Sequence, residues 1–247
     1  MKYFCKIKYL GTDFCGFQVQ PSLRTVQGEL CRALSEALGA EVNVTGCSRT
    51  DAGVHANEFC ITVDCFGATV PPHKLPLAVA RFLPPDLSLY YSEECKQNFH
   101  PRYDAKGKEY LYRIVNQPVF DPFDYGRAWF LPKEITNDAI SKMRAAAEYI
   151  VGRHDFAAFM SEGSDVTDTV REVYYLDIEK NNSLIEVKIC ANGFLYNMVR
   201  IIVGTLIEVA YGRIQPEFVQ QIINSKNRLS AGMTAPAQGL FLNKVIY

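Results

Sequence analysis

The sequence lacks long apolar runs, a signal-peptide pattern and an excess of charge of either sign. Its longest apolar stretch, 201–207, is closed by Arg200 and Glu208, far short of the roughly 20 residues that span a bilayer. Lys6 and Lys8 interrupt the apolar residues at the start, so we expect neither a signal peptide nor a membrane partner. With 26 Lys and Arg against 27 Asp and Glu, the chain is not expected to coat nucleic acid through bulk electrostatics, although a local basic cleft is not excluded.

The cysteines also lack the spacing of a metal site. None of them forms a Cys-x-x-Cys pair, and a zinc site needs such close pairs or nearby histidines. A disulfide framework is typical of short secreted chains. Most of these residues occupy apolar positions of predicted strands or helices, so we interpret them as small hydrophobic residues and expect a cytoplasmic protein without a bound metal. The eight are Cys5, Cys15, Cys31, Cys47, Cys60, Cys65, Cys95 and Cys190.

Apolar material, in contrast, is plentiful. Of the 247 residues, 48% are hydrophobic and 12% are aromatic. A disordered chain lacks this content, and the length suits one large domain or two small ones.

Hydrophobic periodicity predicts the elements of the first half. Alternation over 3–9 indicates a strand. Thr25 is expected to cap a helix that carries Val26, Leu30, Leu34 and Leu38 and ends at Gly39. The remaining elements are strands over 41–45 and 57–66, a helix that begins at Pro72, and a strand over 87–92. Their order is β-α-β-β-α-β.

The second half repeats this order with one extra helix. We expect a strand over 108–116, a helix capped by Thr136 or Asn137, and a hairpin of strands 171–179 and 184–191. A long apolar helix is predicted from about Phe194 to Tyr211, and Pro216 opens another helix. A strand over 239–247 follows.

The repeated order predicts an α+β fold with two halves, 1–105 and 106–247. Each half is expected to be like a ferredoxin or RNA-recognition fold. Side by side, the halves would form one long, mainly antiparallel sheet with helices packed behind it.

The connection over 46–56 is too elaborate for a hairpin turn, which needs two to five residues. It offers the polar side chains of Ser48, Arg49, Thr50, Asp51 and His55, and long polar loops on rigid scaffolds often carry functional sites. One alternative is that Asp51 only caps its own backbone in an Asx turn. Another is that His55 is a packing residue.

Arg200 is unusual because it lies in the middle of the predicted apolar helix. A buried guanidinium is costly unless a carboxylate meets it. The nearest acid in the helix, Glu208, is about two turns away. The partner is therefore expected to be distant in sequence, and Asp51 is a candidate. Alternatively, Arg200 reaches the surface or pairs with another acid.

Residues 96–113 are basic and aromatic, with a local charge of +3 from five Lys or Arg against Asp104 and Glu109. Cations interleaved with Tyr103, Tyr110 and Tyr112 suit RNA, since cations meet phosphates and rings stack on unpaired bases. The alternative is an edge strand with solvated lysines.

Several segments resemble the tRNA pseudouridine synthase A family. The first is Gly46-Cys47-Ser48-Arg49-Thr50-Asp51-Ala52-Gly53-Val54-His55-Ala56, which resembles the active-site motif of that family. Segments 9–20, 25–28, 99–103, 110–113, 197–204 and 235–242 resemble other blocks, in order along nearly the whole chain. One departure is Ser48, where the family usually has glycine, so the loop must adjust if that position needs a positive φ.

This resemblance implies a pseudouridine synthase fold with a central active-site cleft. The implied reaction isomerises uridine to pseudouridine at positions 38, 39 and 40 of the tRNA anticodon stem-loop, without metal or other cofactor. It implies Asp51 as the catalytic nucleophile or proton acceptor, and Arg200 as its cationic partner. It further implies that Tyr110 contacts the target base, that Arg49 holds the flipped nucleotide and that Leu240 packs against the uracil. The family is dimeric, so a homodimer is expected.

Two other classes of protein remain open at this point. A glycoside-type hydrolase would need two facing carboxylates, and Glu58 is the available second acid. A non-catalytic RNA-binding protein would stack bases on exposed aromatic residues of its sheets.

Overall fold

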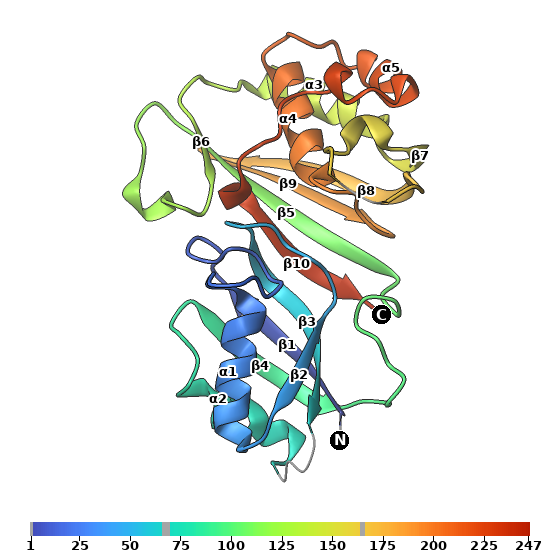
Figure 1. Cartoon of the computed structure of the whole chain (residues 1–247). Helices are drawn as coiled ribbons and strands as arrows, with labels where there is room; N and C mark the ends of the chain where they lie inside the picture. Colours follow the sequence, from blue (N-terminus) through green and yellow to red (C-terminus); the bar gives the residue numbers. More distant parts are fainter. Residues whose placement is uncertain (1, 66–69, 164–165) are drawn as a thin grey trace. The chain divides into compact units, whose positions relative to one another are not determined.

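The structure, a computed structural model, describes residues 2–65, 70–163 and 166–247 (Figure 1). The chain divides into two compact units. Unit 1 comprises Met1–Lys106 together with Phe241–Tyr247, and unit 2 comprises Gly107–Leu240. The segment 241–247, which we had placed in the second half, therefore groups with the first unit.

Unit 1 has the predicted order of elements. These are β1 (Lys2–Tyr9), α1 (Val26–Leu38), β2 (Val42–Gly46), β3 (His55–Cys65), α2 (Leu75–Ala80) after a 3₁₀ turn (Pro72–Lys74), and β4 (Leu87–Glu94). The expected strand 57–66 extends to Phe66, which lies outside the described residues. Strand β10 (Leu240–Ile246) enters this unit at Phe241.

The sheet of unit 1 determines where the long connection leaves it. β3 pairs antiparallel with β1, which in turn pairs antiparallel with β4. The other edge of β3 is shared: β2 pairs with 61–65, whereas Phe241 and Leu242 of β10 pair in parallel with His55 and Ala56. The chain between β2 and β3 therefore lies at the junction on this edge of β3, between the part paired with β2 and the part paired with β10.

Helix α1 begins and ends where its capping residues predict. The Thr25 hydroxyl accepts a hydrogen bond from the Gly28 N–H (3.3 Å), which satisfies one of the free donors of the first turn. Gly39 has φ 64° and donates its N–H to the Ser35 carbonyl (2.9 Å), the left-handed cap that favours glycine. The helix packs its buried face, which includes Leu30 and Leu34, into the core of unit 1.

Apart from the last strand, unit 2 contains the elements predicted for the second half, together with two further short strands, β6 and β7. The elements are β5 (Gly107–Asn116), β6 (Trp129–Leu131), α3 (Asn137–Glu148), β7 (Gly152–Asp155), β8 (Val170–Asn181), β9 (Leu184–Ala191), α4 (Met198–Ala210) and α5 (Phe218–Ser225). The sheet runs β7-β8-β9-β5 with antiparallel neighbours, and β6 lies parallel to β5. The β8–β9 hairpin is confirmed; Asn182 in its turn has φ 54°.

Helix α4 begins later than its apolar pattern predicts. The prediction placed its start at about Phe194, but Asn197 has φ 60°, a left-handed conformation that interrupts a right-handed helix. Arg200 therefore lies in the first turn of α4 and not in its middle. A cation there faces the positive end of the helix dipole, which strengthens its need for an anionic or polar partner.

The predicted α+β class, with mainly antiparallel strands, is confirmed. In the parts of the chain that the structure describes, no helix is long and apolar enough to cross a membrane. Five of the eight cysteines are buried, as expected of small hydrophobic residues.

Candidate active site

The connection that carries Asp51 is an eight-residue loop, 47–54, because β2 ends at Gly46 and β3 begins at His55. We call it the Asp51 loop. Its first residue continues the β2–β3 ladder, with the Cys47 N–H bonded to the Cys60 carbonyl (2.9 Å). Its last turn is closed by a hydrogen bond that the Val54 N–H donates to the Asp51 carbonyl (3.2 Å). The loop is therefore anchored at both ends by backbone hydrogen bonds.

A second segment of unit 1 holds the middle of the Asp51 loop. The hydroxyls of Tyr9 and Thr50 form a buried hydrogen bond (2.8 Å). The Phe17 N–H donates to the Thr50 carbonyl (3.1 Å), and the Gly53 N–H donates to the Phe14 carbonyl (3.4 Å). Because Thr50 is bonded through both side chain and backbone, the backbone at the adjacent Asp51 is held in a defined position.

Two glycines allow this close approach. A Cβ at Gly11 would lie 1.9 Å from the Val54 carbonyl oxygen. A Cβ at Gly16, which has φ +84°, would lie 2.6 Å from the Thr50 carbonyl oxygen. Both glycines belong to the segment 9–20 that carries part of the family resemblance, so that resemblance has a packing explanation in the support of the Asp51 loop.

His55 is a packing residue, the simpler of the two interpretations of its role. Its side chain is fully buried, and its ring stacks on Phe241 with centroids 4.5 Å apart and an interplanar angle of 22°. Nδ1 accepts the Gly11 N–H (2.9 Å), which places the proton of the neutral ring on Nε2. His55 thus joins β3, β10 and the Gly11 turn.

The polar side chains of the Asp51 loop differ in exposure. Asp51 and Ser48 are half-buried, whereas Arg49 is exposed. Ser48 is not among the residues with positive φ. The serine therefore fits the loop without the backbone adjustment that the departure from the family pattern suggested.

Glu58 is not placed as the second carboxylate of a hydrolase. It forms an ion pair with Lys6 (2.8 Å), on the face of the unit 1 sheet opposite to the one on which Tyr9 contacts Thr50. A pair of facing carboxylates needs both groups on the same side of the substrate. This placement argues against the hydrolase interpretation.

Arg200 of unit 2 is held by groups that the sequence did not reveal. Its Nε donates to the Ala235 carbonyl (2.7 Å), and a terminal nitrogen donates to the Asn197 side-chain oxygen (2.7 Å). The Ala235 N–H returns a hydrogen bond to the Arg200 carbonyl (3.1 Å). These bonds fix the direction of a half-buried guanidinium. The left-handed Asn197 thus both delays α4 and orients its arginine.

The segment 232–236 that receives Arg200 is itself tightly packed. The Thr205 hydroxyl accepts the Gly232 N–H (2.9 Å), and a Cβ at Gly204 would lie 1.8 Å from the Met233 carbonyl oxygen. The Tyr112 hydroxyl donates to the Pro236 carbonyl (2.7 Å). Burial raises the pKa of this hydroxyl, and the Arg200 charge opposes the rise. Tyr112 is therefore a neutral donor at ordinary pH.

The two remaining candidates of unit 2 are buried near Tyr112. Tyr110 lies two positions earlier on β5, is 7% exposed, and meets Phe194 edge to face at 5.0 Å. Leu240, also 7% exposed, follows Gly239, where a Cβ would lie 2.6 Å from the Tyr112 ring. Within unit 2, Tyr112 thus contacts both the Gly239 that precedes Leu240 and the segment 232–236 that binds Arg200, and it lies on the same strand as Tyr110. The sequence analysis named Tyr112 only as a ring that could stack on bases; its alternation with Tyr110, which puts both rings on one face of β5, is the signal that could have indicated this role.

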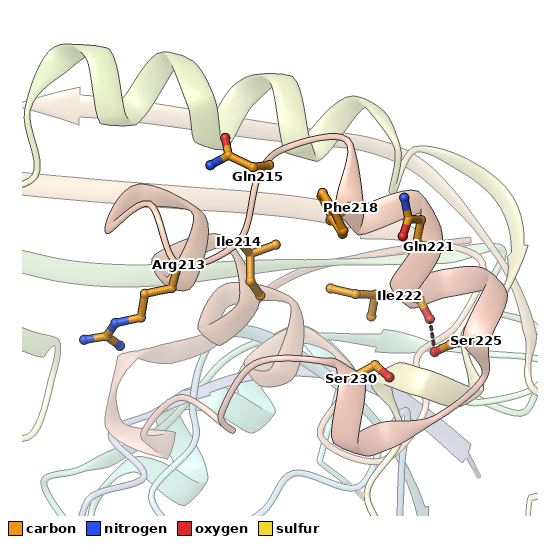
Figure 2. Close-up of a pocket in the computed structure, with 8 residues that line it drawn as sticks. All are labelled: Arg213, Ile214, Gln215, Phe218, Gln221, Ile222, Ser225 and Ser230. Carbon is orange, nitrogen blue, oxygen red and sulfur yellow. Dashed lines mark hydrogen bonds between the residues drawn. The ribbon is translucent and has the colours of Figure 1, made fainter.

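A pocket of about 520 Å³ lies elsewhere in unit 2, between Arg213 and Ser230 (Figure 2). Its apolar lining comes from Ile214, Phe218 and Ile222, and none of the predicted site residues contributes to it. Within residues 2–65, 70–163 and 166–247, no group of three or more His, Cys, Asp or Glu side chains is arranged to hold a metal ion.

Comparison with known proteins gives consistent matches. The family model described as tRNA pseudouridine synthase matches residues 146–247. The chain is 44% identical to tRNA pseudouridine synthase A of Thermoanaerobacter sp. (strain X514), over 98% of this chain and 97% of that protein. It is 44% identical to tRNA pseudouridine synthase A of Brevibacillus brevis over 98% of each. Among solved structures, a Cbf5-Nop10-Gar1 complex matches with a TM-score of 0.41 and 12% identity, over 97% of this chain and 48% of that chain.

Proposed function

Since the chain belongs to the tRNA pseudouridine synthase A family, we propose a target site and a catalytic residue for its reaction. The enzyme is an isomerase that converts uridine to pseudouridine. The N1–C1′ bond of the nucleotide is broken, a C5–C1′ bond forms, the C5 proton is released to solvent and N1 takes up a proton. The proposed targets are positions 38, 39 and 40 of the tRNA anticodon stem-loop, and the proposed catalytic nucleophile is Asp51.

The support of the Asp51 loop is the observation that carries this assignment. Thr50 is held through its hydroxyl by Tyr9 (2.8 Å) and through its carbonyl by Phe17 (3.1 Å). A nucleophile placed by such a scaffold needs little reorganisation when the substrate binds. Attack on C1′, attack on C6 and removal of the C2′ proton each require the ionised form of Asp51, in a site from which bulk water is excluded.

Arg200 is proposed as the cation that favours the ionised form of Asp51, the role that the family resemblance implies. The bonds from Arg200 to Ala235 and Asn197, each 2.7 Å, support this role because they hold the charge in one direction. Its place in the first turn of α4 adds the positive end of a helix dipole to the same region.

Tyr110, Leu240 and Arg49 are proposed to contact the flipped nucleotide. The buried ring of Tyr110, fixed against Phe194, is suited to meet the target base, and Leu240 offers an apolar surface for the uracil. Arg49 is exposed on the Asp51 loop, where a guanidinium can bind phosphate or support the extruded nucleotide. A base inside a stem must leave the stack to be reached.

Release of tritium from tRNA labelled at uracil C5 tests the assignment of Asp51. We expect turnover by the native protein without added metal or nucleotide. Asp51→Asn should show no turnover and should still bind tRNA, because the amide has nearly the same shape but cannot act as a nucleophile or base. Asp64→Asn, which changes a carboxylate at the opposite end of β3, serves as the control and should turn over normally. Undiminished release from Asp51→Asn would show that Asp51 is not the catalytic group.

We further propose that the enzyme works as a homodimer in the cytoplasm. The resemblance to a dimeric family supports the first part. The tRNA substrate of the family supports the second, since tRNA is modified where it is made and used. Light scattering on the purified protein tests the dimer: a mass near 27.8 kDa would contradict it.

A further inference from the structure

The three tyrosines of the basic stretch 96–113 differ sharply in exposure. Tyr110 and Tyr112 are buried, at 7% and 0% exposed, whereas Tyr103 is 74% exposed. The two rings on β5 therefore belong to the interior of unit 2 and offer no exposed surface for stacking, which leaves Tyr110 its proposed contact with a base flipped into the site. Tyr103, in unit 1, remains available.

Tyr103 lies in a turn, 100–104, with an internal framework of hydrogen bonds. The His100 N–H donates to the Asp104 carboxylate (2.8 Å), and the Asp104 N–H donates to the His100 carbonyl (3.0 Å). The N–H groups of Arg102 and Tyr103 approach His100 Nδ1 at 3.1 and 3.4 Å. Turns with this many backbone contacts present their side chains in a defined direction.

The turn is also anchored to the core of unit 1. Pro101 is buried, and its carbonyl accepts the Tyr247 hydroxyl (2.8 Å). Phe99 meets Phe4 and Tyr247 with ring centroids 5.6 and 5.3 Å apart. Lys2 donates to the Phe99 carbonyl (2.8 Å). The residue at the tip is thus exposed although the segment that carries it is fixed.

The surroundings of the Tyr103 ring are aromatic and cationic. The His100 ring lies 4.3 Å from it at an interplanar angle of 36°, and the Arg102 guanidinium lies 5.6 Å from its centroid. Lys96 and Lys106 are also exposed on this stretch. The nearby acid, Asp104, binds the backbone of the turn, so its charge is partly compensated.

We propose that the Tyr103 ring is a stacking platform for an unpaired base of the tRNA, with Arg102 placed to meet an adjacent phosphate. An exposed, fixed ring beside cations is the combination by which proteins bind single-stranded nucleotides. The base is an unpaired one because a base within a helical stem has both of its faces covered. This inference rests on the proposed function, and it concerns substrate binding by a surface apart from the residues assigned to the reaction.

The cations around Tyr103 favour an RNA partner, and Tyr125 provides a comparison within the chain. Tyr125, in unit 2, is also 74% exposed, but it lies in a turn that carries Asp121 and Asp124. Acidic side chains repel the phosphate backbone. Equal exposure with opposite surroundings makes Tyr125 the matched control for Tyr103.

The first test measures the affinity of whole tRNA for the enzyme in an Asp51→Asn background, which prevents turnover. Tyr103→Ala should weaken binding about 10-fold, within the range for loss of one base–aromatic stack. Tyr103→Phe should bind like the parent because it keeps the ring, and Tyr125→Ala should also leave affinity unchanged. Affinity falls as salt rises, and Arg102→Gln should make this fall less steep: the slope of log affinity against log salt concentration should become less negative by about one.

The second test locates the base by a double-mutant cycle with tRNAs that carry single abasic nucleotides. At one unpaired position, removal of the base should eliminate the 10-fold difference between the parent and Tyr103→Ala. Equal effects of Tyr103→Ala on every abasic tRNA, or unchanged binding by Tyr103→Ala, would overturn the inference. So would conversion of a dimer to a monomer by Tyr103→Ala, which would make the ring a protein contact.

Failure of this inference is distinguishable from failure of the proposed function. If native protein releases tritium from tRNA and Tyr103→Ala binds as well as the parent, only the stacking platform is refuted. If native protein neither binds tRNA nor releases tritium, the proposed function itself fails.

Discussion

Replacing Gly16 by alanine should lower activity in addition to its effect on stability. Gly16 contacts the backbone of the Asp51 loop, and its carbonyl accepts the Val26 N–H at the start of α1 (3.2 Å). The added methyl group would therefore push on the residue next to Asp51 while the rest of unit 1 keeps its packing.

The size of the effect follows from two features of the position. First, φ is +84°, and an alanine held in the left-handed region costs about 1–2 kcal/mol. Second, the new Cβ would lie 2.6 Å from the Thr50 carbonyl oxygen. Either residue 16 or the Asp51 loop must therefore move by about 0.8 Å for the two atoms to reach the 3.4 Å of ordinary contact. A misplacement of this order in an active site lowers the rate by roughly 10- to 100-fold.

The assay compares Gly16→Ala with Gly39→Ala. Gly39 also has a positive φ, +64°, but a Cβ there meets nothing within 4 Å, so the control shares the backbone strain and lacks the clash. Urea unfolding should show a loss of stability in both variants, larger for Gly16→Ala because its clash adds to the shared backbone strain. Tritium release from C5-labelled tRNA, at a temperature where both are folded, should be slowed only by Gly16→Ala. Normal turnover by Gly16→Ala would refute the claim that this contact positions the Asp51 loop.

Two further predictions concern unit 2. Lys226 (2.7 Å), Thr169 (2.5 Å) and the Ala157 N–H (3.1 Å) bind the Asp155 carboxylate, and the hydrogen bond with Lys226 is the main cause of its lowered pKa. A carboxyl group whose pKa is lower in the folded state stabilises the protein above its unfolded pKa of about 3.9 and loses this contribution as the pH falls through the folded value. Asp155→Asn should therefore lower the free energy of unfolding by about 1–2 kcal/mol at pH 7. In urea titrations, this difference from the native protein should shrink below pH 4. A difference that does not depend on pH would contradict the prediction. Arg200→Met should keep the fold, as judged by circular dichroism, and lose most of its turnover, because the cation proposed to favour ionised Asp51 is removed; normal turnover would exclude that role.

Elements with local start and stop residues were predictable from the sequence. Helix α1 illustrates this, because Thr25 and Gly39 act within one turn of the residues they cap. The length of the Asp51 loop was recognisable for a similar reason: a hairpin has no use for so many polar residues between two strands.

The start of α4 and the contacts of Arg200 were not predictable in this way. An apolar run shows that a segment is buried but not where its backbone becomes helical, and the left-handed Asn197 made the difference. The bond from Arg200 to Ala235 joins residues 35 positions apart. Side chain-to-carbonyl contacts of this kind leave no periodic pattern in a sequence, whereas the family resemblance did point to Arg200.

The parallel pairing of β10 with β3 has a consequence for the order in which the molecule is assembled. Phe241, on which the His55 ring stacks, leaves the ribosome only after all of unit 2 has been synthesised. A nascent chain can form α1 and most of the first sheet early, since N-terminal regions generally fold first. The residue directly after the Asp51 loop nevertheless lacks its stacking partner until translation has passed residue 241. The part of unit 1 that carries the proposed catalytic residue is therefore completed late, by a segment that is synthesised after the other unit.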